Sequence, residues 1–245
     1  MSIKDWPGGV VTKNQVVPSG PYETSTASGM WTMDQVANYT KQGIWPTAGS
    51  IEPGIESFFS TYLYTGTRST LPISNGIDLA GEGGLVWVKC RNVAFDNSLA
   101  DTSRGVNKIL ISNSTSAEAS IANSVTAFNS DGFTLGSAAA TNDDPQSYVS
   151  WTFRKAPKFF DIVTYTGDGV AGREISHSLG AVPGAMIIKK TSNSEQWAVY
   201  HRSEGNTKYG MLDQTDAFSA FSGAWNDTTP TDTVFTVGNW AKVNQ

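Results

Sequence analysis

The sequence contains few residues that could hold a metal ion or form a disulfide. Among 245 residues there is one cysteine and there are two histidines. Cys90 therefore cannot form an intrachain disulfide, and its position in an apolar run predicts a small buried side chain. His177 and His201 have no third ligand at the tight spacing of a zinc site, so we expect a turn histidine and a strand-end histidine. We expect no cofactor.

Charged residues are also scarce, at 16% of the chain, with a net charge of −5. No stretch concentrates lysine and arginine, which argues against a nucleic-acid-binding groove. There is no uninterrupted apolar run of about 18 residues, so no membrane span is expected. The first nine residues lack the apolar segment of a secretory signal, and we expect synthesis in a reducing cytoplasm.

The most informative feature that is present is a duplication. Phe58-Phe59 and the Tyr-Thr-Gly at 64–66 return at 159–160 and 165–167, a shift of 101 residues. A fixed period of this length predicts two units of about a hundred residues, at 58–156 and 157–245, outside an N-terminal segment at 1–57. The further matching pairs, in the same order, are Ile73-Ser74 with Ile175-Ser176, 84–89 with 184–189, 104–108 with 204–208, and 133–136 with 235–238.

The composition of both copies is typical of an all-β protein. Glycine, serine, threonine and asparagine are abundant, and β-branched or aromatic runs alternate with turn residues. Six or seven short strands per copy predict two tandem β-sandwich repeats of the jelly-roll or lectin-like kind. In the second copy the expected strands are 161–165, 185–189, 197–201, 209–212 and 234–237.

The second copy is expected to lack its last strand. Residues 148–153 close the first copy with an aromatic, β-branched run, and the counterpart would begin near position 250. A sandwich without this strand has an unpaired edge, which a strand from a partner chain or from the N-terminal arm could fill. We expect the natural protein to be longer.

Residues 1–57 are expected to form an extended arm, because proline and glycine punctuate them. One helix is predicted at about 33–42, with Thr32 and Gln35 as a capping box and Gly43 after its end. Three tryptophans in this arm need a surface to cover them, whether a neighbouring repeat, a symmetry mate or another protein. The candidate anchoring residues are Trp6, Trp31 and Trp45.

Catalytic motifs are not found. There is no Gly-x-Ser-x-Gly nucleophile elbow and no phosphate-binding loop, so we predict a protein that is not an enzyme. Asp143 and Asp144 are a weak calcium candidate. A calcium ion needs six to eight oxygen ligands, and a loop with two aspartates followed by Pro145 supplies few of them. Trp225, in a glycine-flanked loop, is the best-placed aromatic for stacking on a sugar ring, with Tyr200 as a second candidate, whereas Trp87 and Trp151 are assigned to the core.

Several of these motifs resemble repeats in virion structural proteins of marine tailed bacteriophages. The resembling segments are 6–14, 29–33, 84–89, 129–136, 148–155 and 165–167. Such repeats occur in tail-fibre, appendage and minor structural proteins and are similar to concanavalin-like lectin sandwiches. The resemblance spans nearly the whole chain, and its motifs are structural.

The resemblance implies a virion protein, with three alternatives for its role. The first is a tail-fibre or appendage subunit that docks on other virion proteins through its arm and contacts host-surface glycans. The second is a capsid decoration or head-fibre protein without a ligand. The third is a polysaccharide depolymerase, which the lack of an evident acid pair disfavours. A symmetric homo-oligomer, with a trimer favoured, is expected in each case.

Overall fold

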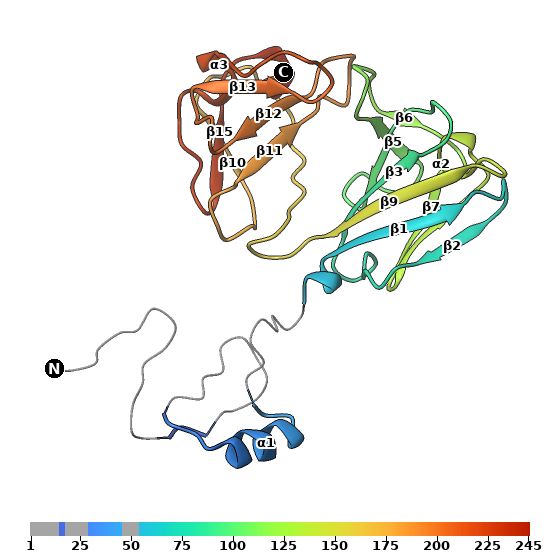
Figure 1. The fold of residues 1–245 in the computed structure, drawn as a ribbon. Helices are drawn as coiled ribbons and strands as arrows, with labels where there is room; N and C mark the ends of the chain where they lie inside the picture. Colours follow the sequence, from blue (N-terminus) through green and yellow to red (C-terminus); the bar gives the residue numbers. More distant parts are fainter. Residues whose placement is uncertain (1–14, 18–28, 46–53) are drawn as a thin grey trace. The chain divides into compact units, whose positions relative to one another are not determined.

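The computed structural model describes residues 15–17, 29–45 and 54–245 (Figure 1). The chain forms two compact units, Met1–Ile55 and Glu56–Gln245. The protein is predominantly β, with several antiparallel sheets, which confirms the all-β class. None of the helices in the described part of the chain is long and apolar enough to cross a bilayer.

In the first unit, helix α1 spans Met33–Lys41. The predicted capping box is present: the Thr32 hydroxyl accepts the Gln35 backbone N–H, and the Gln35 side chain accepts the Thr32 backbone N–H. Trp31 meets Tyr39 and Trp45 edge to face, with ring centroids 5.4 Å and 5.3 Å apart. Trp31 and Trp45, two of the predicted anchoring tryptophans, thus form one aromatic cluster with Tyr39 of α1. The third, Trp6, lies outside the described residues.

The second unit contains all the described strands, in two halves, residues 56–156 and 157–245 (Figure 1). The first half contains β1 Phe59–Thr65, β2 Leu71–Ser74, β3 Gly84–Cys90, β4 Ser98–Asp101, β5 Lys108–Ile111, β6 Ala119–Ser120, β7 Val125–Asn129, β8 Gly132–Leu135, β9 Ser147–Arg154, and the short helices η1 Ile55–Ser57 and α2 Ala139–Asn142. The second contains β10 Arg173–Ser176, β11 Ala185–Ile188, β12 Ala198–His201, β13 Lys208–Met211, β14 Ser219–Ala220, β15 Val234–Val237, α3 Ser222–Trp225 and α4 Ala241–Asn244.

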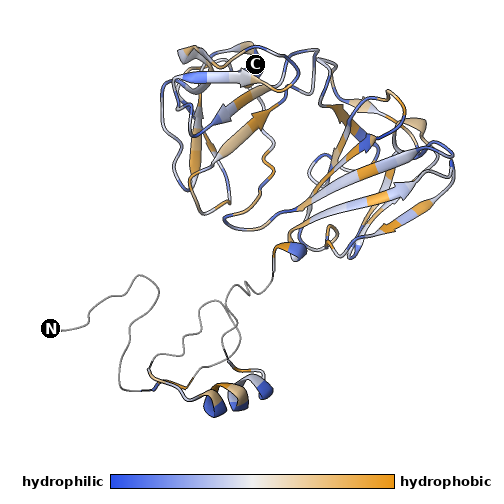
Figure 2. Ribbon diagram, viewed as in Figure 1, coloured by the Kyte–Doolittle hydropathy of each residue, from blue (hydrophilic) through white to orange (hydrophobic). Residues whose placement is uncertain are grey.

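The first half encloses its core between two sheets. One sheet has the order β1-β9-β3-β4-β5-β6 and the other β2-β8-β7. β3 alternates strictly between buried and half-buried residues, so Val86, Val88 and Cys90 face inward. They share one cluster with Phe133 of β8 and Tyr148 of β9. Cys90 is thus a small buried core residue, as predicted. Figure 2 shows apolar and polar segments alternating along these strands.

The second half repeats the polar anchors of the first. Asn142, in α2, and Asn244, in α4, are buried asparagines whose side-chain amides each donate to two backbone carbonyls. Each asparagine is preceded by a residue whose carbonyl accepts from a tyrosine. The Tyr64 hydroxyl donates to the Thr141 carbonyl, and the Tyr165 hydroxyl donates to the Val243 carbonyl. The carbonyls that accept from the asparagines are those of Ser69 and Gly136 in the first half and of Val170 and Gly238 in the second.

The two halves differ at the sheet edge. The second half has the sheets β11-β12-β13-β14 and β10-β15, so among the described strands β11 is paired on one side only. Strands β11, β12, β13 and β15 confirm four of the five predicted for this copy. The prediction of a strand at 161–165 is wrong, because this segment pairs with no strand of the described residues. Its first-half counterpart, β1, pairs with β9, and the second half has no strand equivalent to β9.

The two halves are joined by an apolar cluster of their own. Leu99 and Leu110 of the first half pack with Trp197 of the second, and all three side chains are buried. The Trp197 indole N–H donates to the carbonyls of Ile111 at 3.0 Å and Ser114 at 3.1 Å. An apolar ring with a satisfied polar edge thus fixes the junction.

Candidate ligand-binding site

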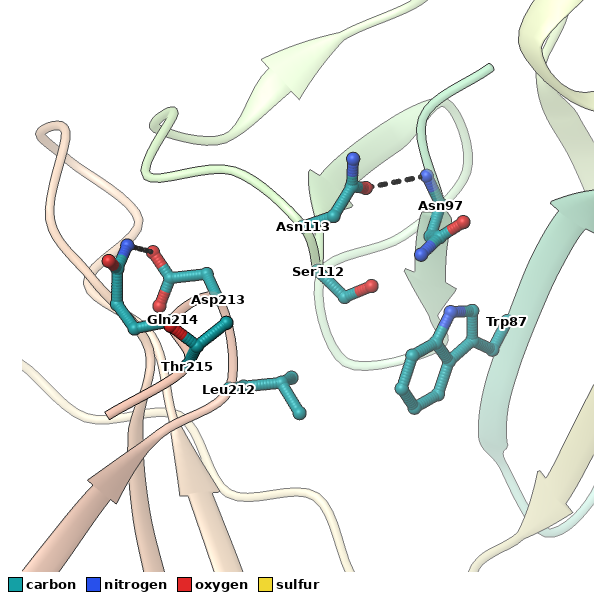
Figure 3. Close-up of a pocket in the computed structure, with 8 residues that line it drawn as sticks. All are labelled: Trp87, Asn97, Ser112, Asn113, Leu212, Asp213, Gln214 and Thr215. Carbon is teal, nitrogen blue, oxygen red and sulfur yellow. Dashed lines mark hydrogen bonds between the residues drawn. The ribbon is translucent and has the colours of Figure 1, made fainter. Parts of the chain in front are cut away.

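A pocket of about 350 Å³ opens where the two halves meet (Figure 3). Its apolar surface is the indole of Trp87, from the centre of β3, and the side chain of Leu212, which both pack against the junction cluster. The remaining lining residues are polar and come from turns of both halves: Asn97, Ser112, Asn113, Asp213, Gln214 and Thr215.

The duplication explains why polar turns converge here. Residues 112–115 and 212–215 are corresponding turns, 100 residues apart, that follow β5 and β13. Each turn is fixed by the same side-chain bond. Asn113 Oδ1 accepts the Asn97 backbone N–H at 2.8 Å, and Asp213 Oδ1 accepts the Trp197 backbone N–H at 3.0 Å. Two equivalent rigid turns therefore line one pocket.

Two buried polar atoms of this lining have no hydrogen-bond partner among the described residues: Trp87 Nε1, a donor, and Asn97 Oδ1, an acceptor. In Figure 3 the ring edge that carries the indole nitrogen lies toward Asn97 and Ser112. Leaving a buried donor or acceptor unpaired destabilises a fold by about 1–3 kcal/mol, so each such atom needs an explanation. A ligand with hydroxyl groups could pair with both atoms.

The electrostatics of the pocket suit an uncharged polar ligand. Asp213 is the one acidic residue of the lining, and the other polar groups are amides and hydroxyls. Nearby, Lys189 donates to the carbonyls of Thr115 and Lys190. Burial lowers the pKa of the Lys189 ammonium, and the Asp213 charge opposes this shift. A glycoside hydrolase needs two carboxyl groups across the scissile bond, and the lining provides one.

The aromatic residues predicted to contact sugar are not at this pocket. Trp225 is 0% exposed and Tyr200 is 2% exposed, and their rings meet edge to face in the core of the second half. The Trp225 indole N–H donates to the Lys208 carbonyl at 2.9 Å. This corrects the expectation of a surface aromatic pair. Trp225 and Tyr200 align with Val125 and Ala100 of the first half, which are also core residues. The second core is thus filled by large rings where the first has two small side chains.

The weak calcium candidate is engaged in an ion pair. Asp143 Oδ1 lies 2.5 Å from Arg68 Nε, and Asp144 is the next residue, before Pro145. Among the described residues no group of three or more histidine, cysteine, aspartate or glutamate side chains could hold a metal ion. His177 directly follows β10, where its ring stacks on Phe235, and His201 ends β12 with its Nδ1 2.7 Å from the Ser203 hydroxyl.

Sequence reasoning missed the polar residues of the pocket and assigned Trp87 to the core alone. A usable signal was present in the duplication. Aligned turns carry Asn113 and Asp213, which share a backbone-capping role, and position 97 is asparagine where its counterpart, 197, is tryptophan. The convergence of these turns depends on the packing of the halves, which local patterns do not specify.

The family model described as a domain of unknown function (DUF7483) matches residues 55–245, which is the whole β-rich unit. No curated protein and no solved structure matches the chain.

Proposed function

The chain belongs to the DUF7483 family, and we propose that it is a structural subunit of a tailed-phage virion, in a tail fibre or appendage, that contacts host-surface glycans. The proposal draws its virion context from the repeated motifs that resemble phage structural proteins. The ligand class comes from the pocket at the junction of the halves. The protein acts by binding, without catalysis.

The observation that carries the glycan assignment is the pairing of an indole ring with unpaired polar atoms. Trp87 keeps part of its ring exposed, and aromatic faces pack well against the apolar faces of sugar rings. Its free Nε1 donor and the Asn97 Oδ1 acceptor match hydroxyl groups, which both donate and accept. Gln214 and Thr215 at the exposed rim add further polar partners.

The same proposal assigns a tandem architecture and an anchoring arm. Two tandem sandwich repeats of the lectin-like kind are supported by the repeated asparagine and tyrosine anchors of the halves. The N-terminal segment docks on other virion proteins through the aromatic cluster of Trp31 and Trp45, and the subunit forms a homo-oligomer, with a trimer favoured. The protein resides in the virion.

A glycan array probed with the full chain tests the ligand. We expect a defined set of hits whose signal falls about tenfold for Asn97→Ala, because loss of one hydrogen bond to the ligand costs roughly 1.4 kcal/mol of binding free energy. Gln214→Ala should give a smaller loss, since this side chain is exposed. Asn206→Ala, outside the pocket, serves as the matched control.

A blank array would contradict the glycan assignment and favour the capsid-decoration alternative, in which the protein has no ligand. Hits that survive every pocket substitution would move the site elsewhere on the surface. The arm is tested separately. A chain that begins at Glu56 should fold but fail to join virions, and incorporation at normal levels would overturn the anchoring role.

A further inference from the structure

A second pocket, also of about 350 Å³, lies next to the pocket at the junction of the halves. Its lining residues all belong to the second half, and none of them lines the first pocket. They are Gln196, Tyr209, Gly210, Met211, Asp216, Ala217 and Ser219. The glycan site described above leaves this second pocket without a role.

One segment of chain, between β13 and β14, lines both pockets. Residues 212–215 line the first pocket (Figure 3), and their immediate neighbours, Met211 and Asp216, line the second. Because consecutive Cα atoms are about 3.8 Å apart, the wall of one pocket continues directly into the wall of the other. A sugar chain bound in the first pocket therefore has the second pocket within its reach.

The second pocket repeats the chemical features of the first. Tyr209 contributes a half-buried aromatic ring, as Trp87 does in the first pocket. Asp216 is the one acidic residue of the second lining, as Asp213 is of the first, and the other polar side chains carry amide or hydroxyl groups. An aromatic face packs against the apolar face of a sugar ring, and a carboxylate accepts hydrogen bonds from hydroxyl groups.

The Tyr209 ring is held in place by two other aromatic rings. The ring centroids of Trp240 and Phe221 lie 4.6 Å and 6.0 Å from that of Tyr209. Lys242 Nζ lies 5.3 Å from the Trp240 ring and forms an ion pair with Glu195 at 2.6 Å. Phe221 is 41% exposed, so this aromatic cluster is open to solvent. A fixed and partly exposed ring binds a ligand with little loss of side-chain entropy.

The comparison of the halves explains why this part of the second half is open. In the first half, Phe95 and Ile121 pack against the core. Their counterparts, 100 residues later, are Glu195, which is paired with Lys242, and the exposed Phe221. The second half therefore has a charged residue and an exposed ring where the first has two side chains packed on its core.

We propose that the second pocket is a further sugar subsite, and that the ligand is an extended glycan whose chain occupies both pockets. This inference rests on the glycan binding proposed above. One sugar unit packs on Trp87 in the first pocket, and a later unit of the same chain packs on Tyr209 and donates hydroxyl hydrogen bonds to Asp216. A chain that fills both pockets binds more tightly than one unit, because its second contact is intramolecular.

The test compares long and short probes on the full chain. The probes are each glycan that the array returns and the free monosaccharide of its terminal unit, and calorimetric titration gives the Kd of each. We expect the whole glycan to bind at least about tenfold more tightly than the monosaccharide. In ¹⁵N-resolved spectra, the amide resonances of Gly210 and Ala217 should shift when the whole glycan is added.

Variants of the second pocket locate the effect. Asp216→Ala should weaken binding of the whole glycan about tenfold, because it removes a charged hydrogen-bond acceptor, and should leave monosaccharide binding unchanged. Tyr209→Leu removes the ring and should act in the same way, with circular dichroism to confirm its fold. Asp232→Ala is the matched control, because Asp232 is an exposed aspartate of the same half outside both linings. It should bind both probes as the wild type does.

Two results would overturn the second subsite and leave glycan binding at the first pocket intact. One is equal affinity for the whole glycan and the monosaccharide. The other is tighter binding of the whole glycan that survives both Asp216→Ala and Tyr209→Leu, because the additional contacts would then lie elsewhere on the protein. A blank array would overturn glycan binding and the second subsite together.

Discussion

The two halves of the β-rich unit share their polar anchors and differ in how they fill and close their cores. Asn142 and Asn244 make equivalent bonds, as do Tyr64 and Tyr165. The first half closes its core with β9, whereas the second is filled by Trp225 and Tyr200 and ends at the open edge of β11. The comparison shows that the anchors fix the frame of this fold and that core volume can come from different elements.

The largest expected effect is on the free energy of unfolding when Trp225 is removed from the core of the second half. Trp225→Ala should lower the free energy of unfolding by about 3–5 kcal/mol, because it removes a fully buried indole. Val125→Ala, at the corresponding position of the first half, should cost roughly 2 kcal/mol, in proportion to the smaller volume removed. Urea denaturation followed by circular dichroism measures both values. A loss below that of Val125→Ala would mean that Trp225 is not part of the core.

The second prediction tests the equivalence of the anchors. Asn142→Ala and Asn244→Ala should each destabilise the protein by roughly 3 kcal/mol, because each removes three hydrogen bonds of a buried side chain at about 1 kcal/mol apiece. Asn38→Ala, on the exposed face of α1, should stay within about 0.5 kcal/mol of the wild type. If one buried asparagine matters and the other does not, the two halves are not built on the same frame.

The smallest expected effect concerns Tyr148 of β9, the strand that has no counterpart in the second half. Burial raises the pKa of the Tyr148 phenol to about 12, from an ordinary value of 10.0. The neutral phenol is favoured in the folded state, so its contribution to stability is complete below pH 10 and is lost as the pH rises towards 12. Tyr148→Phe should be less stable at neutral pH by about 1 kcal/mol, through loss of the bond to the Ala139 carbonyl.

The variant should also lose less stability than the wild type between pH 10 and pH 12. Denaturation curves at several pH values, with the second-half variant Tyr200→Phe run alongside, check this difference. An unchanged pH slope in Tyr148→Phe would show that other groups cause the alkaline loss.

Much of the fold could be predicted because its signals are local. The Thr32–Gln35 capping box defines α1, and the alternation along 84–90 defines β3. Where pairing decides, local signals fail. Residues 161–165 have β-type composition, yet a strand needs a partner, and the second half has none there.

The candidate site was harder to predict for a different reason. Trp225 lies in the sequence Gly223-Ala224-Trp225-Asn226, which is typical of a surface loop, yet the side chain is fully buried by tertiary packing. Its alignment with Val125 was the better guide. Asn97 and Asp213 come together only because Trp197 joins the two halves, and no periodicity in the sequence encodes that contact.

The central claim is that the second half has the frame of the first without one strand. Residue-resolved hydrogen exchange of the free full chain tests it most directly, by comparing amides at the same position in the two halves. Leu85 and Trp87 pair with β9, whereas Ala185 and Ile187 face the open edge. We predict that the first pair exchanges only through global opening and that the second exchanges at least about a hundredfold faster. Equal protection of the two pairs would contradict the claim.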